Sequence, residues 1–291
     1  MMTRAQLASN PQSDVLSVRF SPYNPNYVFG GTYTGQVLLW DTRNRHPNPA
    51  LASPLSAVGH THPIYSLDLV GSTHAHNLVS ASTDGTVCSW ATDGKFREPA
   101  STLDLLHPMN SKTDDVSVTA MGFPQGENNT FWVGTEEGKV YAALQEAAGG
   151  RKAGLLQNEM YQGHNGPVTG LDFHPVAGAV DLSDLFLTCG VDWTVRLWQK
   201  GTGGASAVSV GGGSAGGGAS AAAASSKSTQ IKHEPLITFE EADDYIYDVK
   251  WHPHHPALFG SVDGAGNFNL WNMNEDTEVG SSGALLWWSY N

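Results

Sequence analysis

The chain has 291 residues, with 28 Asp and Glu against 15 Lys and Arg, so its formal net charge is −13. This balance disfavours direct nucleic-acid binding, because an acidic surface repels phosphate backbones. There is no run of 18 apolar residues that could span a membrane, no apolar signal-peptide core at the start, and only two cysteines. We therefore expect a protein of a reducing compartment that does not enter a membrane.

A short segment recurs five times along the chain and predicts β-strands. Each copy begins with small residues, makes a polar or glycine-containing turn, and then alternates apolar and polar residues up to its last position, which is Trp in four copies. The alternation has the period of a half-buried strand, and the preceding turn is typical of a β-hairpin. The copies cover residues 30–40, 80–90, 133–143, 188–198 and 261–271.

A second segment lies upstream of each copy and predicts a further strand. Its last residue precedes the end of the following copy by 20 or 21 residues in four cases and by 25 in the other. Its apolar residues fall at positions one, four and six, and a regular strand would place positions one and four on opposite faces. A β-bulge after position one would bring them to the same face and is therefore predicted. The segments are residues 15–20, 64–69, 118–123, 168–173 and 246–251.

The copies end 50, 53, 55 and 73 residues apart, and a repeat of this kind is typical of a β-propeller in which each copy forms one blade. The sequence therefore predicts an all-β propeller with five recognisable blades within residues 14–279. The longest spacing contains a Gly, Ala and Ser-rich stretch at 201–229, which has little to bury and is expected to be a surface loop between blades. Residues 1–13 are expected to be disordered, and residues 280–291 form an atypical tail.

Two copies carry the residues of a buried hydrogen-bond network. A Gly-His pair, a Ser or Thr, an Asp in the turn and the final Trp stand at matching places in both, and this pattern resembles the WD-repeat family. The resemblance implies that the Asp accepts a hydrogen bond from the His, the His reaches the hydroxyl, and the hydroxyl reaches the indole N–H of the Trp. The residues are His60, Ser80, Asp84 and Trp90 in one copy, and His164, Thr188, Asp192 and Trp198 in the other.

The other three copies are incomplete. Ala143 stands where Trp is expected, and Thr34 and Ala265 stand where the turn Asp is expected. We therefore expect those blades to be held mainly by apolar packing.

Twelve histidines raise the alternative of a metal-binding protein or a propeller enzyme. A zinc site needs three or four protein ligands in a fixed geometry, and the histidine clusters do not offer such a set. His60 belongs to the network, while His252 and His254 stand beside prolines that are typical of a turn. No glycine-rich phosphate loop and no nucleophile elbow is present. We expect no catalytic, cofactor-binding or metal-binding residue and no cofactor.

Several sequence stretches are more specific than the general repeat pattern and resemble the cytoplasmic dynein intermediate chains. They are HTHPIY at 60–65, AGAVDLSDLF at 177–186, DWTVRLW at 192–198 and HPALF at 255–259. The resemblance implies a non-catalytic scaffold subunit of the cytoplasmic dynein motor complex, which binds the heavy-chain tail and supports minus-end-directed microtubule transport. It also implies a cytoplasmic, microtubule-associated protein. The alternative is a WD-repeat scaffold of another cytoplasmic multiprotein complex.

The sequence departs from that family in two ways. The N-terminal region that binds dynactin and the light chains in the family has no counterpart, so neither partner is expected here. The family's propeller has about seven blades, so the five found here would form an incomplete ring with two unpaired strand edges, which are an aggregation hazard. We therefore interpret the chain as a fragment or truncated product, and the alternative is a propeller that closes with a partner.

Four aromatic residues are candidates for a partner interface, since aromatic side chains are enriched at interfaces. Tyr65 and Tyr247 follow the first apolar position of their strands and are expected near one face of the propeller. Tyr245 is close to Tyr247 in sequence, and Trp193 occupies the turn of its copy. The alternative is that these side chains simply pack between blades.

Overall fold

A computed structural model describes residues 13–46, 48–55, 58–92, 96–106, 116–145, 155–175, 181–201 and 232–274. Of the predicted disordered start, surface loop and tail, only Ser13 and Gly201 lie within these ranges. The described residues form strands, turns and loops without a helix, so this part of the chain holds no helix able to cross a membrane.

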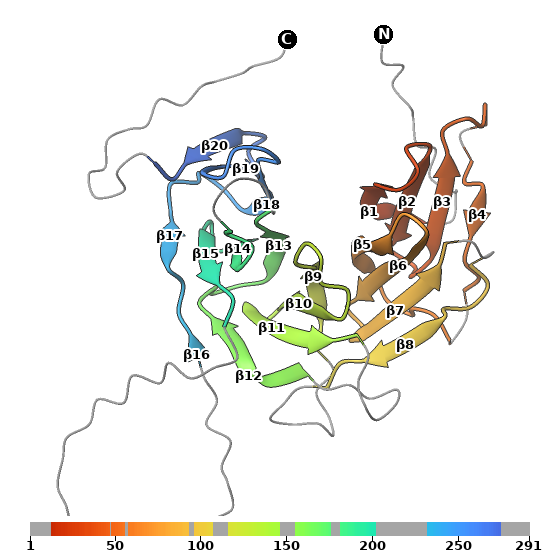
Figure 1. Cartoon of the computed structure of the whole chain (residues 1–291), viewed down its shortest axis with the longest axis horizontal. Coiled ribbons are helices and arrows are strands. Elements are labelled where there is room, and N and C mark those ends of the chain that lie inside the picture. The colour runs from red at the N-terminus through yellow and green to blue at the C-terminus, as the bar shows by residue number, and fades with distance from the viewer. Residues whose placement is uncertain are drawn as a thin grey trace, which may run out of the picture.

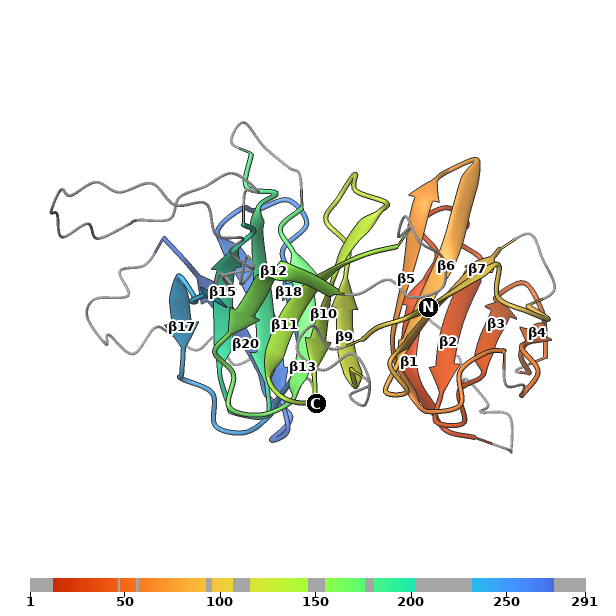
Figure 2. The same ribbon diagram turned by 90° about the horizontal axis from the view of Figure 1, so that it is seen from below.

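Five β-sheets follow one another around an open arc, with blades 1 and 5 at its two ends (Figure 1). Seen from the side, the axes of most strands are roughly aligned with one another (Figure 2). Blade 1 contains β1 (Val15–Phe20), β2 (Tyr27–Thr32), β3 (Val37–Asp41) and β4 (Leu51–Ala52). Blade 2 contains β5 (Ile64–Ser72), β6 (Ala75–Ser82), β7 (Thr86–Ala91) and β8 (Ser101–Asp104). Blade 3 contains β9 (Val118–Gly122), β10 (Thr130–Thr135), β11 (Lys139–Leu144), β12 (Leu155–Gln162) and the added β16 (Lys232–His233). Blade 4 contains β13 (Val168–Phe173), β14 (Leu185–Gly190), β15 (Val195–Gln199) and β17 (Ile237–Phe239), and blade 5 contains β18 (Ile246–Trp251), β19 (Leu258–Asp263) and β20 (Phe268–Asn272).

The prediction of an all-β propeller with five blades is confirmed. Consecutive strands of each blade pair in antiparallel fashion, and the first strands of neighbouring blades contact one another in the order β1, β5, β9, β13 and β18. The only parallel pairing among the described strands joins β16 to β12. The segment that follows the predicted loop thus covers the outer edge of blade 3 before β17 joins blade 4, which protects a strand edge that would otherwise be unpaired.

The predicted bulge is confirmed in all five blades. In blade 2, for example, Ile64 pairs with Ser82 and Ser66 with Ala81, so the register shifts after the first residue of the strand. The same shift follows the first residue of the other four inner strands, which are Val15, Val118, Val168 and Ile246. The extra residue turns positions one, four and six to one face, which the neighbouring blade then covers.

The core lies between the blades. Phe29 and Leu39 of blade 1 share one apolar cluster with Leu67, Leu69 and Leu78 of blade 2. The same arrangement recurs at each of the next three blade junctions. Each interior blade is therefore stabilised by burial of apolar area on both of its faces.

The two ends of the arc depart from this pattern. Val18 and Phe20 stand at positions four and six of β1, where burial is predicted, yet 45% and 68% of their surfaces are exposed. At the other end, Phe268 and Leu270 of β20 are 63% and 54% exposed, although their equivalents in blade 4 are buried. The reason is that the described residues provide no blade beyond β1 or β20. These strands therefore carry the apolar positions that face a neighbouring blade elsewhere, but no blade covers them.

Hydroxyl groups next to the bulges link successive blades. The Thr119 hydroxyl donates to the carbonyl oxygen of Val168 in the next blade at 2.5 Å. Thr169 donates in the same way to the carbonyl of Ile246, and Ser17 to that of Ile64. These side chains join the inner strands and contribute a structural link between blades.

Candidate functional site

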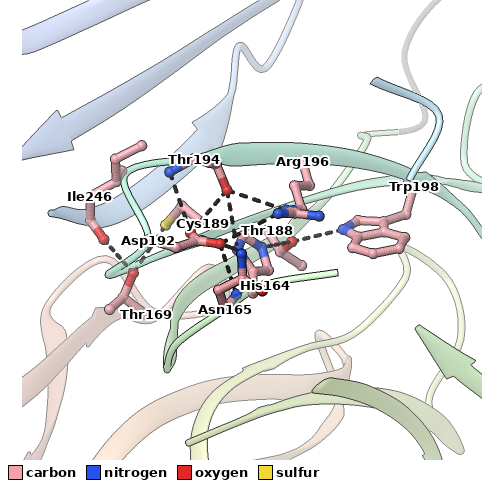
Figure 3. A network of polar contacts seen from close by, with 10 residues as sticks. All are labelled: His164, Asn165, Thr169, Thr188, Cys189, Asp192, Thr194, Arg196, Trp198 and Ile246. Atoms are coloured by element: carbon pink, nitrogen blue, oxygen red, sulfur yellow. Dashed lines mark hydrogen bonds and ion pairs between the residues drawn. The ribbon is translucent and has the colours of Figure 1, made fainter. Parts of the chain in front are cut away.

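The network in blade 4 joins four buried or half-buried side chains (Figure 3). The indole N–H of Trp198 on β15 donates to the Thr188 hydroxyl on β14 at 2.7 Å, and that hydroxyl lies 2.7 Å from His164 Nε2. On the other side of the ring, Nδ1 lies 2.9 Å from Asp192 Oδ1 in the β14–β15 turn. Because a carboxylate only accepts, Nδ1 carries the proton and Nε2 accepts from Thr188. Every polar group of this network therefore has a hydrogen-bond partner.

The network in blade 2 differs in the place of its threonine, because Thr86 lies between the His and the Asp, whereas the equivalent Thr194 donates to Asp192 beside a direct contact between His164 and Asp192. Trp90 donates to Ser80 at 2.8 Å, and Ser80 lies 2.6 Å from His60 Nε2. The Nδ1 atom of His60 lies 2.8 Å from the Thr86 hydroxyl, which itself donates to Asp84 at 2.6 Å. The predicted direct hydrogen bond from His60 to Asp84 is therefore wrong, since their nearest atoms are 3.6 Å apart and Thr86 bridges them. The Asp84 carboxylate also accepts from the backbone N–H of Thr61, which holds the preceding loop.

Blade 5 retains part of the same network, and the sequence analysis did not predict this part. Trp271 donates its indole N–H to the Ser261 hydroxyl at 2.9 Å. The available signal was the spacing, because Ser261 stands as far before Trp271 as Thr188 stands before Trp198. Blade 1 has Trp40 but carries Gly30 at that position, and the Trp40 indole N–H has no hydrogen-bond partner among the described residues.

The four candidate interface residues all lie on one face, here called the upper face. It is formed by the turns between the second and third strands of the blades and by the starts of the inner strands. Trp193 and Tyr245 are each 47% exposed, and their rings meet edge to face with centroids 6.3 Å apart. Tyr247 is 58% exposed. The structure brings Trp193 and Tyr245 into contact, and it places Tyr247 at a central cavity.

The fourth candidate, Tyr65, lies apart on blade 2 and is 45% exposed. It lines a central cavity of about 1760 Å³, together with Tyr247 on blade 5. Sequence reasoning missed Tyr33, an exposed side chain from the blade 1 turn that lines the same cavity. Its place in the turn of an aligned copy was the signal that could have identified it.

The remaining histidines form no site in the described part of the chain. The backbone N–H groups of His254 and His255 donate to Nδ1 of His252 at 3.2 and 2.9 Å, so His252 stabilises a turn. Among the described residues, no three His, Cys, Asp or Glu side chains are grouped so that they could hold a metal ion.

Comparison with known proteins agrees with this geometry. The family model for the WD domain, G-beta repeat, matches residues 53–91 and 156–199, which contain the two complete networks. Blades 2 and 4 therefore carry WD repeats. Over 275 residues, 94% of the chain, it is 40% identical to the cytoplasmic dynein 1 intermediate chain of Drosophila melanogaster. The resemblance predicted from the sequence phrases is confirmed, and the chain spans 36% of the length of that relative.

The two WD-repeat networks differ in the charge of their histidines. Burial lowers the pKa of His164 and outweighs Asp192, and the cation of Arg196 acts in the same direction. Burial also disfavours the charged form of His60, but Asp84 and Cys88 outweigh it and raise its pKa to about 9. In blade 2 the Ser80 hydroxyl can donate to the carbonyl of Cys88 at 3.4 Å, which leaves its oxygen free to accept from a protonated His60 Nε2.

The stability of the WD-repeat blades is expected to fall as the pH rises from 6.5 to 9. The pKa of His60 is raised from 6.5 to about 9, so its contribution is complete below pH 6.5 and is lost as the pH passes through 9. Urea unfolding of the chain and of His60→Gln across this pH range measures the effect. The slope should be shallower in the variant, and equal slopes would contradict a charged His60.

At acidic pH, the dependence of stability on pH has the opposite sign, because stability falls as the pH falls. Burial raises the pKa of Asp84, but the nearby His60 imidazole and the hydrogen bonds from Thr86 and Thr61 outweigh it and lower the pKa. Its contribution is therefore present above the unfolded value of 3.8 and is lost as the pH falls below it. Asp84→Asn should flatten this acidic limb, and it should also make the alkaline limb shallower, because Asp84 helps to raise the pKa of His60.

Proposed function

We propose that this chain is a non-catalytic scaffold subunit of the cytoplasmic dynein motor complex. It binds the tail of the dynein heavy chain and supports minus-end-directed transport in the cytoplasm, in association with microtubules. The observation that carries this proposal is the 40% identity to a cytoplasmic dynein 1 intermediate chain across 94% of the chain.

The arrangement of the polar residues supports a binding role. His60 and His164 are 2% and 5% exposed and are fully engaged in the two networks, so neither imidazole is available to a substrate. Such networks fix the blades and so fix the loops that the blades carry. A rigid framework with exposed loops is suited to holding partners in a set geometry.

The upper face is the part of the surface that we propose for the heavy chain. It exposes Tyr65, Trp193, Tyr245 and Tyr247, each 45% or more exposed. Aromatic side chains bury a large area when a partner covers them, and they dominate the energy of many interfaces. Their exposure on a single face of a rigid scaffold is the pattern that such an interface requires.

Replacing Tyr65, Trp193 and Tyr247 together with Ala is expected to reduce heavy-chain recovery by at least about tenfold, since interface aromatics cost more than 1 kcal/mol each when truncated. The measurement is affinity capture of the tagged chain from its own cells, with the heavy chain quantified by mass spectrometry. Leu236→Ala removes an apolar side chain that is 54% exposed and lies just before β17, so it serves as a matched control. Recovery of a different complex by the unaltered chain would contradict the dynein assignment and support the alternative scaffold.

A further inference from the structure

Trp193 has a backbone conformation that the other blades reserve for glycine. Its φ angle is +65°, and the equivalent turn residues Gly35, Gly85, Gly138 and Gly266 have φ angles of +77° to +87°. A residue with a Cβ atom pays a free-energy cost in this left-handed region, and a bulky side chain is rare there. Blade 4 therefore departs from the pattern of four sister turns at one residue.

The fold gains little from this Trp. The side chain is 47% exposed, and its ring contact is with Tyr245, which is itself 47% exposed. The neighbouring Asp192 supplies the network bonds of the turn, and Trp193 takes no part in them. Sister turns with glycine close the same hairpin. The Trp193 side chain forces an unfavourable backbone conformation and is still half exposed to water. Binding of a ligand explains its presence better than packing in the fold does.

Two carboxylate residues precede Tyr245 of this pair in the sequence. Asp243 is exposed and Asp244 half-buried, and both directly precede Tyr245. A Cβ atom built on Gly264 would lie 2.7 Å from Asp244 Oδ2 and 3.3 Å from a ring carbon of Tyr247, so both side chains lie beside the blade 5 turn. We call Trp193, Asp243, Asp244, Tyr245 and Tyr247 the acidic aromatic surface.

Positive charges near this surface are already engaged. Residues 234–249 contain five carboxylate side chains besides Glu234 and no Lys or Arg. Lys250 is paired with Asp172 at 3.1 Å and with Asp248 at 3.7 Å, and Arg196 lies 3.5 Å from Asp192. No ion pair joins Asp243 or Asp244 to a cation among the described residues.

We propose that the acidic aromatic surface binds a partner segment that carries Arg or Lys side chains. A guanidinium or ammonium group is attracted to the face of an indole or phenol ring, and Trp is the best of these rings. Asp243 and Asp244 supply carboxylates that pair with further cations, and Arg can accept both kinds of contact at once. This inference rests on the proposed scaffold function and names the chemistry of the segment that the upper face receives.

The test uses a fluorescent peptide of alternating Arg and Gly as the probe, with its citrulline analogue as the neutral control. Anisotropy at low salt measures the affinity of each peptide for the chain. We expect the Arg peptide to bind and the citrulline peptide to bind at least about fivefold more weakly, and Trp193→Gly and Asp243→Asn with Asp244→Asn should each weaken the Arg peptide by about fivefold. Glu98→Gln with Asp181→Asn removes the same charge from loops on the opposite face and should leave the affinity unchanged.

Trp193→Gly also separates binding from folding. Glycine relieves the positive φ angle, so the variant should unfold at the same or a higher urea concentration than the unaltered chain. A less stable variant would assign Trp193 a structural role and overturn the proposal, as would equal affinity for the two peptides or unchanged affinity in both surface variants. If the unaltered chain recovers no heavy chain from cells, but binds the Arg peptide selectively and the surface variants weaken that binding, the proposed function is overturned and this surface is supported. Recovery of the heavy chain without a preference for the Arg peptide would support the proposed function and overturn this surface.

Discussion

Replacing Thr188 with Val is expected to lower the free energy of unfolding by about 2 to 4 kcal/mol. The substitution keeps the shape of the side chain and removes only the hydroxyl, which sits between the Trp198 indole N–H and His164 Nε2 at 2.7 Å from each. Both Thr188 and Trp198 are 1% exposed or less, so water cannot replace the lost partner. A buried polar group left without a partner costs about 1 to 3 kcal/mol, and here there are two.

Urea unfolding measures this loss, provided that the dependence of the unfolding free energy on urea concentration is the same for the variant and the unaltered chain. Thr188→Ser is the matched control, because it keeps the hydroxyl and loses only a methyl group, which costs about 1 kcal/mol. The hydroxyl is the essential group if the Val variant is clearly less stable than the Ser variant. A Ser variant that is as unstable as the Val variant would show that packing of the methyl group, and not the network, holds blade 4.

Gly138→Ala is the second substitution with a large expected effect, a loss of about 3 kcal/mol or more. Gly138 has a φ angle of +80°, and a left-handed conformation costs a residue with a Cβ about 1 to 2 kcal/mol. The added Cβ would also lie 2.5 Å from the carbonyl oxygen of His164 and 2.8 Å from that of Gly166. These are backbone atoms of the loop that enters blade 4, so they can move only if the blades separate.

Gly266 provides the control within the same molecule. It occupies the equivalent turn of blade 5 with a φ angle of +87°, but a Cβ there would meet no atom within 4 Å. Gly266→Ala should therefore cost only the conformational part, about 1 to 2 kcal/mol. Thermal or urea unfolding of both variants gives the comparison. Equal losses would mean that the close approach between blades 3 and 4 contributes nothing to the need for glycine.

The fold could be predicted from the sequence because its units repeat. Five aligned copies gave the blades, and the odd spacing of apolar residues at positions one, four and six gave the bulge. Both features are local, since they depend on the alternation of side chains along one strand. The partner class that we propose comes from the resemblance to the dynein intermediate chains, because no local pattern contains it.

The features that were not predicted depend on neighbours. Whether Phe20 is buried depends on a blade beyond β1, and its own strand carries the same pattern in either case. Thr86 enters the blade 2 network because a hydroxyl there lies between His60 and Asp84, a geometry that spacing alone does not reveal. The role of Thr119 appears only when two inner strands are side by side. Sequence patterns therefore gave the blades, and contacts between blades needed the structure.

The dynein assignment is tested most directly by mixing the purified chain with a recombinant dynein heavy-chain tail and measuring the mass of the products by light scattering after size-exclusion chromatography. We expect a stable complex that elutes ahead of both components. Separate elution of the two proteins, with a chain that still unfolds cooperatively, would contradict the proposal that this propeller is a scaffold for the heavy chain.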